Sequence, residues 1–147
     1  MNDLNYQPYR SPNGWYMLAF PEHWEVEVIE EIPAFYDPDG AGALQVSAFE
    51  NKLGIYDLAE ELARFLAFHK IEYDENCIAS FTNNLGSKIK ACEFISEERF
   101  WLVYMISFRS KLIVCTYNSD EKPDKELSIM LTNIISSIRF LQAENLN

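Results

Sequence analysis

Residues 99–118 read RFWLVYMISFRSKLIVCTYN, and this stretch decides the fold. Two apolar runs, 99–108 and 111–118, are separated only by Arg109 and Ser110, a spacing that predicts a β-hairpin. In both runs apolar side chains occupy the two alternating sets of positions, so both faces of each strand are apolar. Such strands lie in the centre of a sheet that is covered on both sides. We therefore expect a sheet enclosed between two further layers.

The segments around this hairpin supply the rest of the sheet and its cover. Runs 76–83 and 87–96 precede it with short links, NLG between them and EE before residue 99, which predicts four strands joined by hairpins. A helix is expected from Asp57 onward, and a second one from Pro123–Asp124. The first has an apolar stripe at helical spacing: Leu58, Leu62, Phe65, Leu66 and His69. The second has a longer one: Leu127, Met130, Leu131, Ile134, Ile135 and Ile138.

Shorter strands are predicted closer to the N-terminus. Residues 15–20 form an apolar run, and residues 24–28 alternate valine with glutamate, as in a strand with one face in water. We interpret FPEHW between them as the link of an antiparallel pair. A DPDG turn at 37–40 leads into a further strand at 43–50.

The length of 147 residues fits one compact domain, and 48% hydrophobic with 24% charged residues excludes wholesale disorder. Residues 1–13 predict an extended N-terminal arm, residues 14–141 a single domain, and residues 142–147 a frayed tail. The N-terminus lacks a signal-peptide pattern, and no apolar run approaches the roughly 20 residues of a membrane span. We expect a cytoplasmic protein.

The order of these elements predicts an α+β fold, a mainly antiparallel sheet flanked by helices in an α/β/α sandwich. GWYMLAFPEHW (14–24) resembles the opening strand of the PsbP-like fold, of the type G-aromatic-x-hydrophobic-x-[FY]-P-x-x-W. FYDP with Gly40, followed by LQVS (44–47), is similar to the next hairpin of that group, and IISSIRF (134–140) to its closing segments. Many small bacterial proteins of this build have no assigned activity. The resemblance implies architecture and no functional residue.

The net charge of −11 makes nucleic acid and anionic membranes improbable partners. Residues 1–75 hold 4 basic and 15 acidic side chains, whereas residues 76–147 hold 8 of each, so the excess lies in the first half. This asymmetry predicts an acidic face. The predicted partner-binding residues are Trp24, Glu25, Glu27, Glu30, Glu31 and Tyr36. A second interpretation stays open, in which the rings belong to the core and the acids only keep the protein soluble.

We expect no catalytic residue, no metal site and no cofactor. His23 is interpreted as a turn histidine, and a calcium loop starting at Asp37 fails because Ala41 and Ala48 stand at liganding positions. The cysteines lack CxxC spacing and are interpreted as small buried hydrophobic residues: Cys77, Cys92 and Cys115. No nucleophile elbow or glycine-rich phosphate loop is present in the sequence.

The function predicted from these observations is that of a non-enzymatic accessory or adaptor module. It would bind a protein partner through an acidic face, which favours a basic partner, or through a sheet edge. The alternative is a small-ligand-binding or enzymatic domain with a cavity between sheet and helix. A homodimer formed through an edge strand is compatible with both hypotheses.

Overall fold

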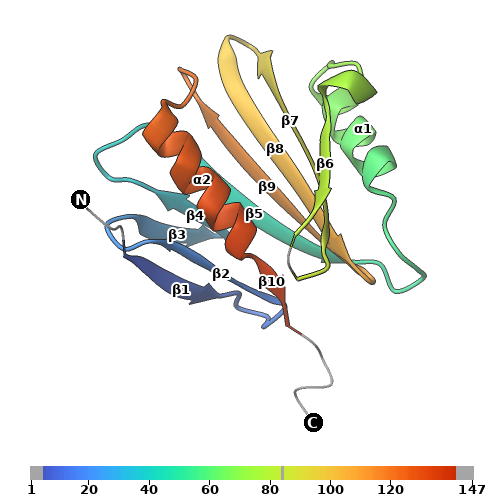
Figure 1. The fold of residues 1–147 in the computed structure, drawn as a ribbon, viewed down its shortest axis with the longest axis horizontal. Coiled ribbons are helices and arrows are strands. Elements are labelled where there is room, and N and C mark those ends of the chain that lie inside the picture. The colour runs from blue at the N-terminus through green and yellow to red at the C-terminus, as the bar shows by residue number, and fades with distance from the viewer. Residues whose placement is uncertain (1–4, 84, 142–147) are drawn as a thin grey trace.

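The computed structural model describes residues 5–83 and 85–141. It contains a seven-stranded sheet, a three-stranded sheet and two α-helices (Figure 1). The strands of the large sheet are, in chain order, β3 (Glu25–Ile29), β4 (Ile32–Tyr36), β5 (Ala43–Glu50), β6 (Ala79–Thr82), β7 (Lys88–Ser96), β8 (Arg99–Phe108) and β9 (Lys111–Ser119). The small sheet consists of β1 (Tyr6–Arg10), β2 (Tyr16–Pro21) and β10 (Arg139–Phe140). The helices are α1 (Leu58–Phe68), α2 (Lys125–Ser137) and the 3₁₀ turn η1 (Glu75–Cys77).

The large sheet has the strand order β3-β4-β5-β9-β8-β7-β6, and all of its pairs are antiparallel. The hairpin predicted from residues 99–118 is confirmed, with Phe108 opposite Lys111 across a two-residue turn. Its two strands, β8 and β9, are interior strands of the sheet, as their apolar faces require. The α+β fold with a mainly antiparallel sheet is therefore confirmed.

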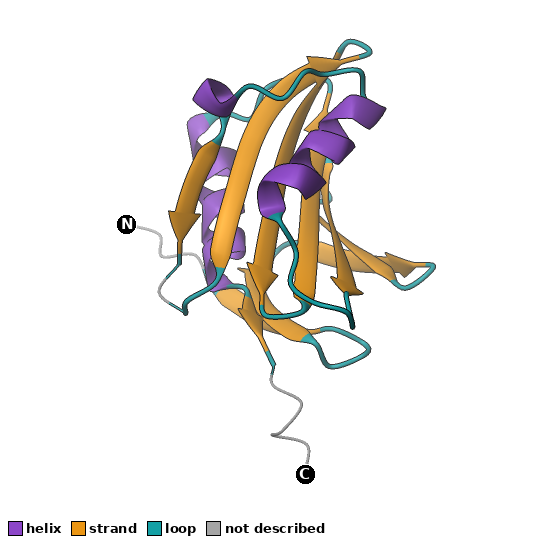
Figure 2. Ribbon diagram, turned by 90° about the vertical axis from the view of Figure 1, so that its right-hand side faces the viewer, coloured by secondary structure: helices purple, strands orange, loops and turns teal. Residues whose placement is uncertain are grey.

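The two helices lie on opposite faces of the large sheet (Figure 2). α1 packs on β7 and β8 and buries Leu58, Leu62 and Leu66 against Val103 and other strand residues. α2 and the small sheet cover the other face, where the buried stripe of α2 meets side chains of β5, β8 and β9. Each helix begins at the predicted aspartate: Asp57 accepts a hydrogen bond from the Glu60 amide, and Asp124 from that of Leu127. Neither described helix combines the length and the apolar character that crossing a bilayer requires.

The small sheet corrects two expectations for the N-terminal region. Residues 6–10 of the expected arm form β1, which pairs with β2 along its whole length. FPEHW does not link an antiparallel pair, since β2 belongs to the small sheet and β3 to the large one. The segment is a corner at which the chain changes sheets, closed by a 3.0 Å bond from the Trp24 amide to the Pro21 carbonyl. The predicted tail, 142–147, lies outside the described residues.

Three smaller predictions are wrong in detail. Strand β3 has no buried face, because all five of its residues are exposed, including Val26 and Val28. The run 76–83 divides into η1 and the short strand β6. Of the three cysteines, Cys115 is buried and Cys92 half-buried, whereas Cys77 is exposed on η1.

Two hairpins of the large sheet turn on a pair of glutamates. Glu30 and Glu31 connect β3 with β4, and Glu97 and Glu98 connect β7 with β8. All four residues have positive φ angles, between 51° and 70°. This is the left-handed conformation of a type I′ turn, which favours Asn-Gly and disfavours residues with longer side chains.

We expect the double substitution Glu97→Asn/Glu98→Gly to raise the free energy of unfolding by about 1 to 2 kcal/mol, because Asn and Gly tolerate the left-handed conformation. Urea denaturation measures the change. The control, Glu97→Gln/Glu98→Gln, removes the adjacent charges and keeps the side-chain length. A gain of equal size in the control would identify charge repulsion, and not the backbone, as the source.

Candidate functional site: the acidic end of the large sheet

The predicted acidic residues lie on the β3–β4 hairpin, at one edge of the large sheet. β4 is the only strand that pairs with β3 in the described part of the chain, so the other side of β3 is free. Glu25 and Glu27 alternate with Val26 and Val28 and are exposed, as are the turn residues Glu30 and Glu31. A free edge of this kind can accept an additional strand from another protein.

Tyr36 lies at the base of the hairpin, directly opposite Glu25. Its hydroxyl donates a 3.4 Å hydrogen bond to Glu25 Oε1 and it is half-buried. Partial burial, together with the charges of Glu25 and Glu27, raises the pKa of Tyr36. This tyrosine is therefore a neutral hydrogen-bond donor beside two carboxylates.

Trp24 does not lie on the surface, so its prediction as a partner-binding residue is wrong, and the second interpretation, in which the rings belong to the core, holds for this residue. It is only 4% exposed and belongs to the core between the large sheet, α2 and the small sheet. Its indole Nε1 is buried without a hydrogen-bond partner in the structure. Burial follows from its position, because Trp24 stands at the corner between the sheets, where its ring has elements on several sides.

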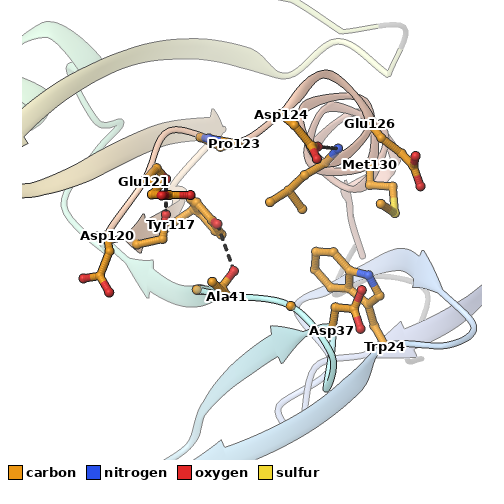
Figure 3. A pocket seen from close by; sticks show the side chains of 14 residues that line it. Trp24, Asp37, Ala41, Tyr117, Asp120, Glu121, Pro123, Asp124, Glu126 and Met130 are labelled. Atoms are coloured by element: carbon orange, nitrogen blue, oxygen red, sulfur yellow. Dashed lines mark hydrogen bonds between the residues drawn. The ribbon is translucent and has the colours of Figure 1, made fainter.

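Trp24 forms part of the wall of a pocket of about 510 Å³ at this end of the molecule (Figure 3). The pocket lies between the 37–42 turn, the end of β9 and the first turn of α2. Trp24, Tyr117, Leu127 and Met130 give it an aromatic and aliphatic floor. Its size is within the usual range of ligand sites.

Five carboxylates line this pocket, and no lysine or arginine does: Asp37, Asp120, Glu121, Asp124 and Glu126. Several of them also have structural partners. Asp37 accepts a 2.9 Å bond from the Asp39 amide and lies 3.6 Å from His23 Nε2, Asp120 pairs with Arg99, and Asp124 caps α2. The nearby Lys122 points instead to Glu93, at 3.3 Å. All charged side chains in the lining of the pocket are therefore acidic.

The shape of the pocket depends on close contact between Gly42 and Tyr117. The Tyr117 hydroxyl donates a 3.0 Å hydrogen bond to the Ala41 carbonyl, which fixes the 37–42 turn on β9 (Figure 3). Gly42 has a φ of +80°, and a Cβ there would stand 2.6 Å from the tyrosine ring. Only glycine fits this position without displacement.

The structure separates the remaining candidate residues from one another. His23 lies beside Asp37 at the acidic end, whereas His69 packs among Phe65, Phe94 and Trp101 at the end of α1. Within residues 5–83 and 85–141, no group of three or more His, Cys, Asp or Glu side chains is arranged to hold a metal ion.

None of the cysteines has the lowered pKa that a nucleophilic thiol needs. The charge of Asp74 raises the pKa of Cys77. Burial raises the pKa of Cys92 to about 11, and it raises that of Cys115 as well. All three thiols are therefore protonated near neutral pH.

The sequence analysis did not identify four of the five carboxylates that line the pocket. Asp120, Glu121, Asp124 and Glu126 belong to the second half of the chain, in which the charges balance, and no local signal connects them with Asp37. The connection comes from the pairing of β5 with β9, which places Ala43 opposite Asn118. The DPDG turn was predicted correctly. The sequence did not show that the segment following β9, which carries the other four carboxylates, lies beside this turn.

No protein-family model matches the chain, and no curated protein does. The structure is similar to a protein of Bacteroides thetaiotaomicron, with a TM-score of 0.65 and 14% identity. That match covers 94% of this chain and 49% of the other, so the chain spans about half the length of the Bacteroides protein. It is also similar to the cyanobacterial PsbP protein (CyanoP) of Synechocystis, with a TM-score of 0.65, 15% identity, and coverage of 96% and 95%. At this identity the likeness is one of architecture, and the chain has the PsbP-like fold.

Proposed function

We propose that the protein is a non-enzymatic accessory or adaptor module that binds a basic protein partner at its acidic end. The observation that carries this proposal is the pocket whose lining contains five carboxylates and neither lysine nor arginine. It adjoins the base of the β3–β4 hairpin, where Trp24 and Asp37 flank the paired residues Glu25 and Tyr36, whereas Glu30 and Glu31 lie at the other end of that hairpin. Together the pocket and the base of the hairpin form a negative surface with an apolar floor, which suits the aliphatic stem and charged head of a lysine or arginine side chain.

The free edge of β3 suggests how the partner's backbone is held. A strand added to β3 would gain main-chain hydrogen bonds, while its basic side chains meet Glu25 and Glu27. The charge of −11 steers such a partner before contact, so the association rate falls as salt rises.

The test is selection of binders from a displayed library of random peptides, followed by titration of the best peptides at low and high salt. We expect enrichment of lysine and arginine, and affinity that falls with salt. The variant Glu25→Lys/Glu27→Lys is expected to weaken binding at least about tenfold, which corresponds to about 1.4 kcal/mol.

The matched control is Glu60→Lys/Glu72→Lys, which changes the charge by the same amount at two exposed positions on and just after α1. It should keep most of the affinity, because neither residue lines the acidic pocket and α1 covers the opposite face of the large sheet (Figure 2). The proposal is wrong if reversal at Glu25 and Glu27 leaves binding unchanged, or if the selected peptides carry no basic residues.

A small organic cation is the second candidate occupant, because the pocket volume and its carboxylates suit one. Calorimetric titration with a linear diamine is the probe. Binding that is lost in Glu126→Gln and kept in Glu25→Lys/Glu27→Lys would favour this alternative over a protein partner.

A further inference from the structure

A second hollow lies on the opposite face of the large sheet, beside α1. It measures about 580 Å³ and is lined mainly by side chains of β5, β9 and α1. We call it the α1 groove. Its lining comprises Gln45, Ser47, Phe49, Tyr56, Glu61, Arg64, Phe65, Phe68, Met105, Leu112, Val114 and Thr116. The groove exists because α1 packs on β7 and β8, which leaves the same face of β5 uncovered.

Large apolar side chains are exposed around this groove. Phe68, on the last turn of α1, is 85% exposed, and Phe49 at the end of β5 is 49% exposed. The segment between Phe49 and Tyr56 adds Leu53, 99% exposed, and Ile55, 78% exposed. Monomeric proteins rarely leave apolar side chains of this size grouped in water, so this grouping indicates a surface that another protein covers.

The charges around the groove indicate which protein covers it. Glu61 and Arg64 are its only charged lining residues, and they neutralise each other at 2.9 Å. Two copies of a chain with a net charge of −11 repel each other at the acidic end, where every charged lining residue is a carboxylate. The α1 groove is a surface on which two copies can meet without that repulsion.

The α1 groove has features that suit a two-fold contact between two copies. Each copy offers a concave surface and a projecting ring, Phe68, at its rim. Arg64 lies at the same rim within 2.9 Å of Glu60 as well as Glu61. In a two-fold contact, any residue pair made once is made twice, so an exchanged pair between Arg64 and Glu60 occurs on both sides of the axis.

We propose that the α1 groove is the interface of a homodimer, in which Phe68 of each copy enters the groove of the other. This surface is separate from the acidic end. The dimer therefore leaves both acidic ends free, and it doubles the number of sites for a partner with two basic segments.

The test is the mass of the full chain in solution by sedimentation equilibrium across the micromolar range. We expect twice the chain mass of 17.1 kDa for the wild type, and a dissociation constant raised at least tenfold in Phe68→Glu. Because Phe68 is so exposed, this substitution should leave the far-UV circular dichroism unchanged. Ile95→Glu is the matched control, since Ile95 is 70% exposed and lies on β7, outside the groove lining. It should leave the dimer intact.

The effect of salt on affinity distinguishes dimer formation through the α1 groove from partner binding at the acidic end. Added salt screens the repulsion between two acidic copies, so the dimer should become tighter, whereas binding of a basic partner becomes weaker. Glu25→Lys/Glu27→Lys should not dissociate the dimer. A single-chain mass for the wild type at all concentrations would overturn the proposal. So would equal weakening by Phe68→Glu and Ile95→Glu, or loss of the dimer on changing the β3 edge.

Discussion

Replacement of Phe35 by alanine is expected to lower the free energy of unfolding by about 3 to 5 kcal/mol. Phe35 has no exposed surface and joins the β3–β4 hairpin to the small sheet. Its ring packs edge-on against Tyr9, with centroids 5.1 Å apart, and lies 5.0 Å from Phe20. The five residues of β3 are all exposed and β4 buries only Pro33 and Phe35, so Phe35 supplies the larger of the two buried side chains of this hairpin.

Urea denaturation measures the global effect, and hydrogen exchange of the β3 and β4 amides measures the local one. We expect the hairpin to lose protection more than β8 and β9 do. The control is Val28→Ala on the same hairpin, which should change stability by less than about 0.5 kcal/mol because Val28 is exposed. Similar losses for both variants would show that the hairpin is not held through Phe35.

Gly42→Ala is expected to destabilise the protein by about 2 to 4 kcal/mol. Part of the effect is the left-handed backbone, and the rest is the collision between the new Cβ and the Tyr117 ring. The ring cannot move freely, because Tyr117 is buried and its hydroxyl is bonded to Ala41. Relief of the clash would shift the 37–42 turn and change the wall of the acidic pocket.

Two other glycines separate these contributions. Gly86 has a φ of +85° with nothing within 4 Å of a new Cβ, so Gly86→Ala isolates the backbone effect. Gly54 has neither a positive φ nor a neighbour, and Gly54→Ala should be neutral or slightly stabilising. Thermal and urea unfolding of the three variants give the comparison. Equal losses at Gly42 and Gly86 would exclude the clash as a contributor.

The layered fold was predictable because its signals are local. The apolar faces of residues 99–118 identify interior strands, and the helical stripes identify the two covers. The EE link at 97–98 was recognised as a hairpin turn, whereas the same dipeptide at 30–31 was assigned only to the acidic run. The apolar residues that flank the dipeptide at 30–31, Ile29 and Ile32, could have indicated that it connects two strands.

The remaining errors concern partners that are distant in sequence. An alternating strand such as 24–28 has the same pattern whether it continues one sheet or starts another, so the change of sheet at FPEHW was not detectable. Trp24 was named as a partner-binding residue because of its acidic neighbours, with a place in the core as the open alternative, and the elements that bury it include α2, about 100 residues later. Charge totals predicted acidity in the first half of the chain, but the pocket draws four of its five carboxylates from the second half.

The small sheet has a consequence for synthesis of the chain. β2 lies between β1 and β10, and Ser137 accepts a 2.8 Å hydrogen bond from the Ala19 amide, 118 positions earlier. A ribosome must therefore add the 118 residues from Ala19 to Ser137 before β2 can be enclosed, and until then the apolar side chains of β2 lack their neighbours on α2 and β10. Nascent chains stalled before α2 should accordingly engage chaperones, and release past residue 140 should end that engagement.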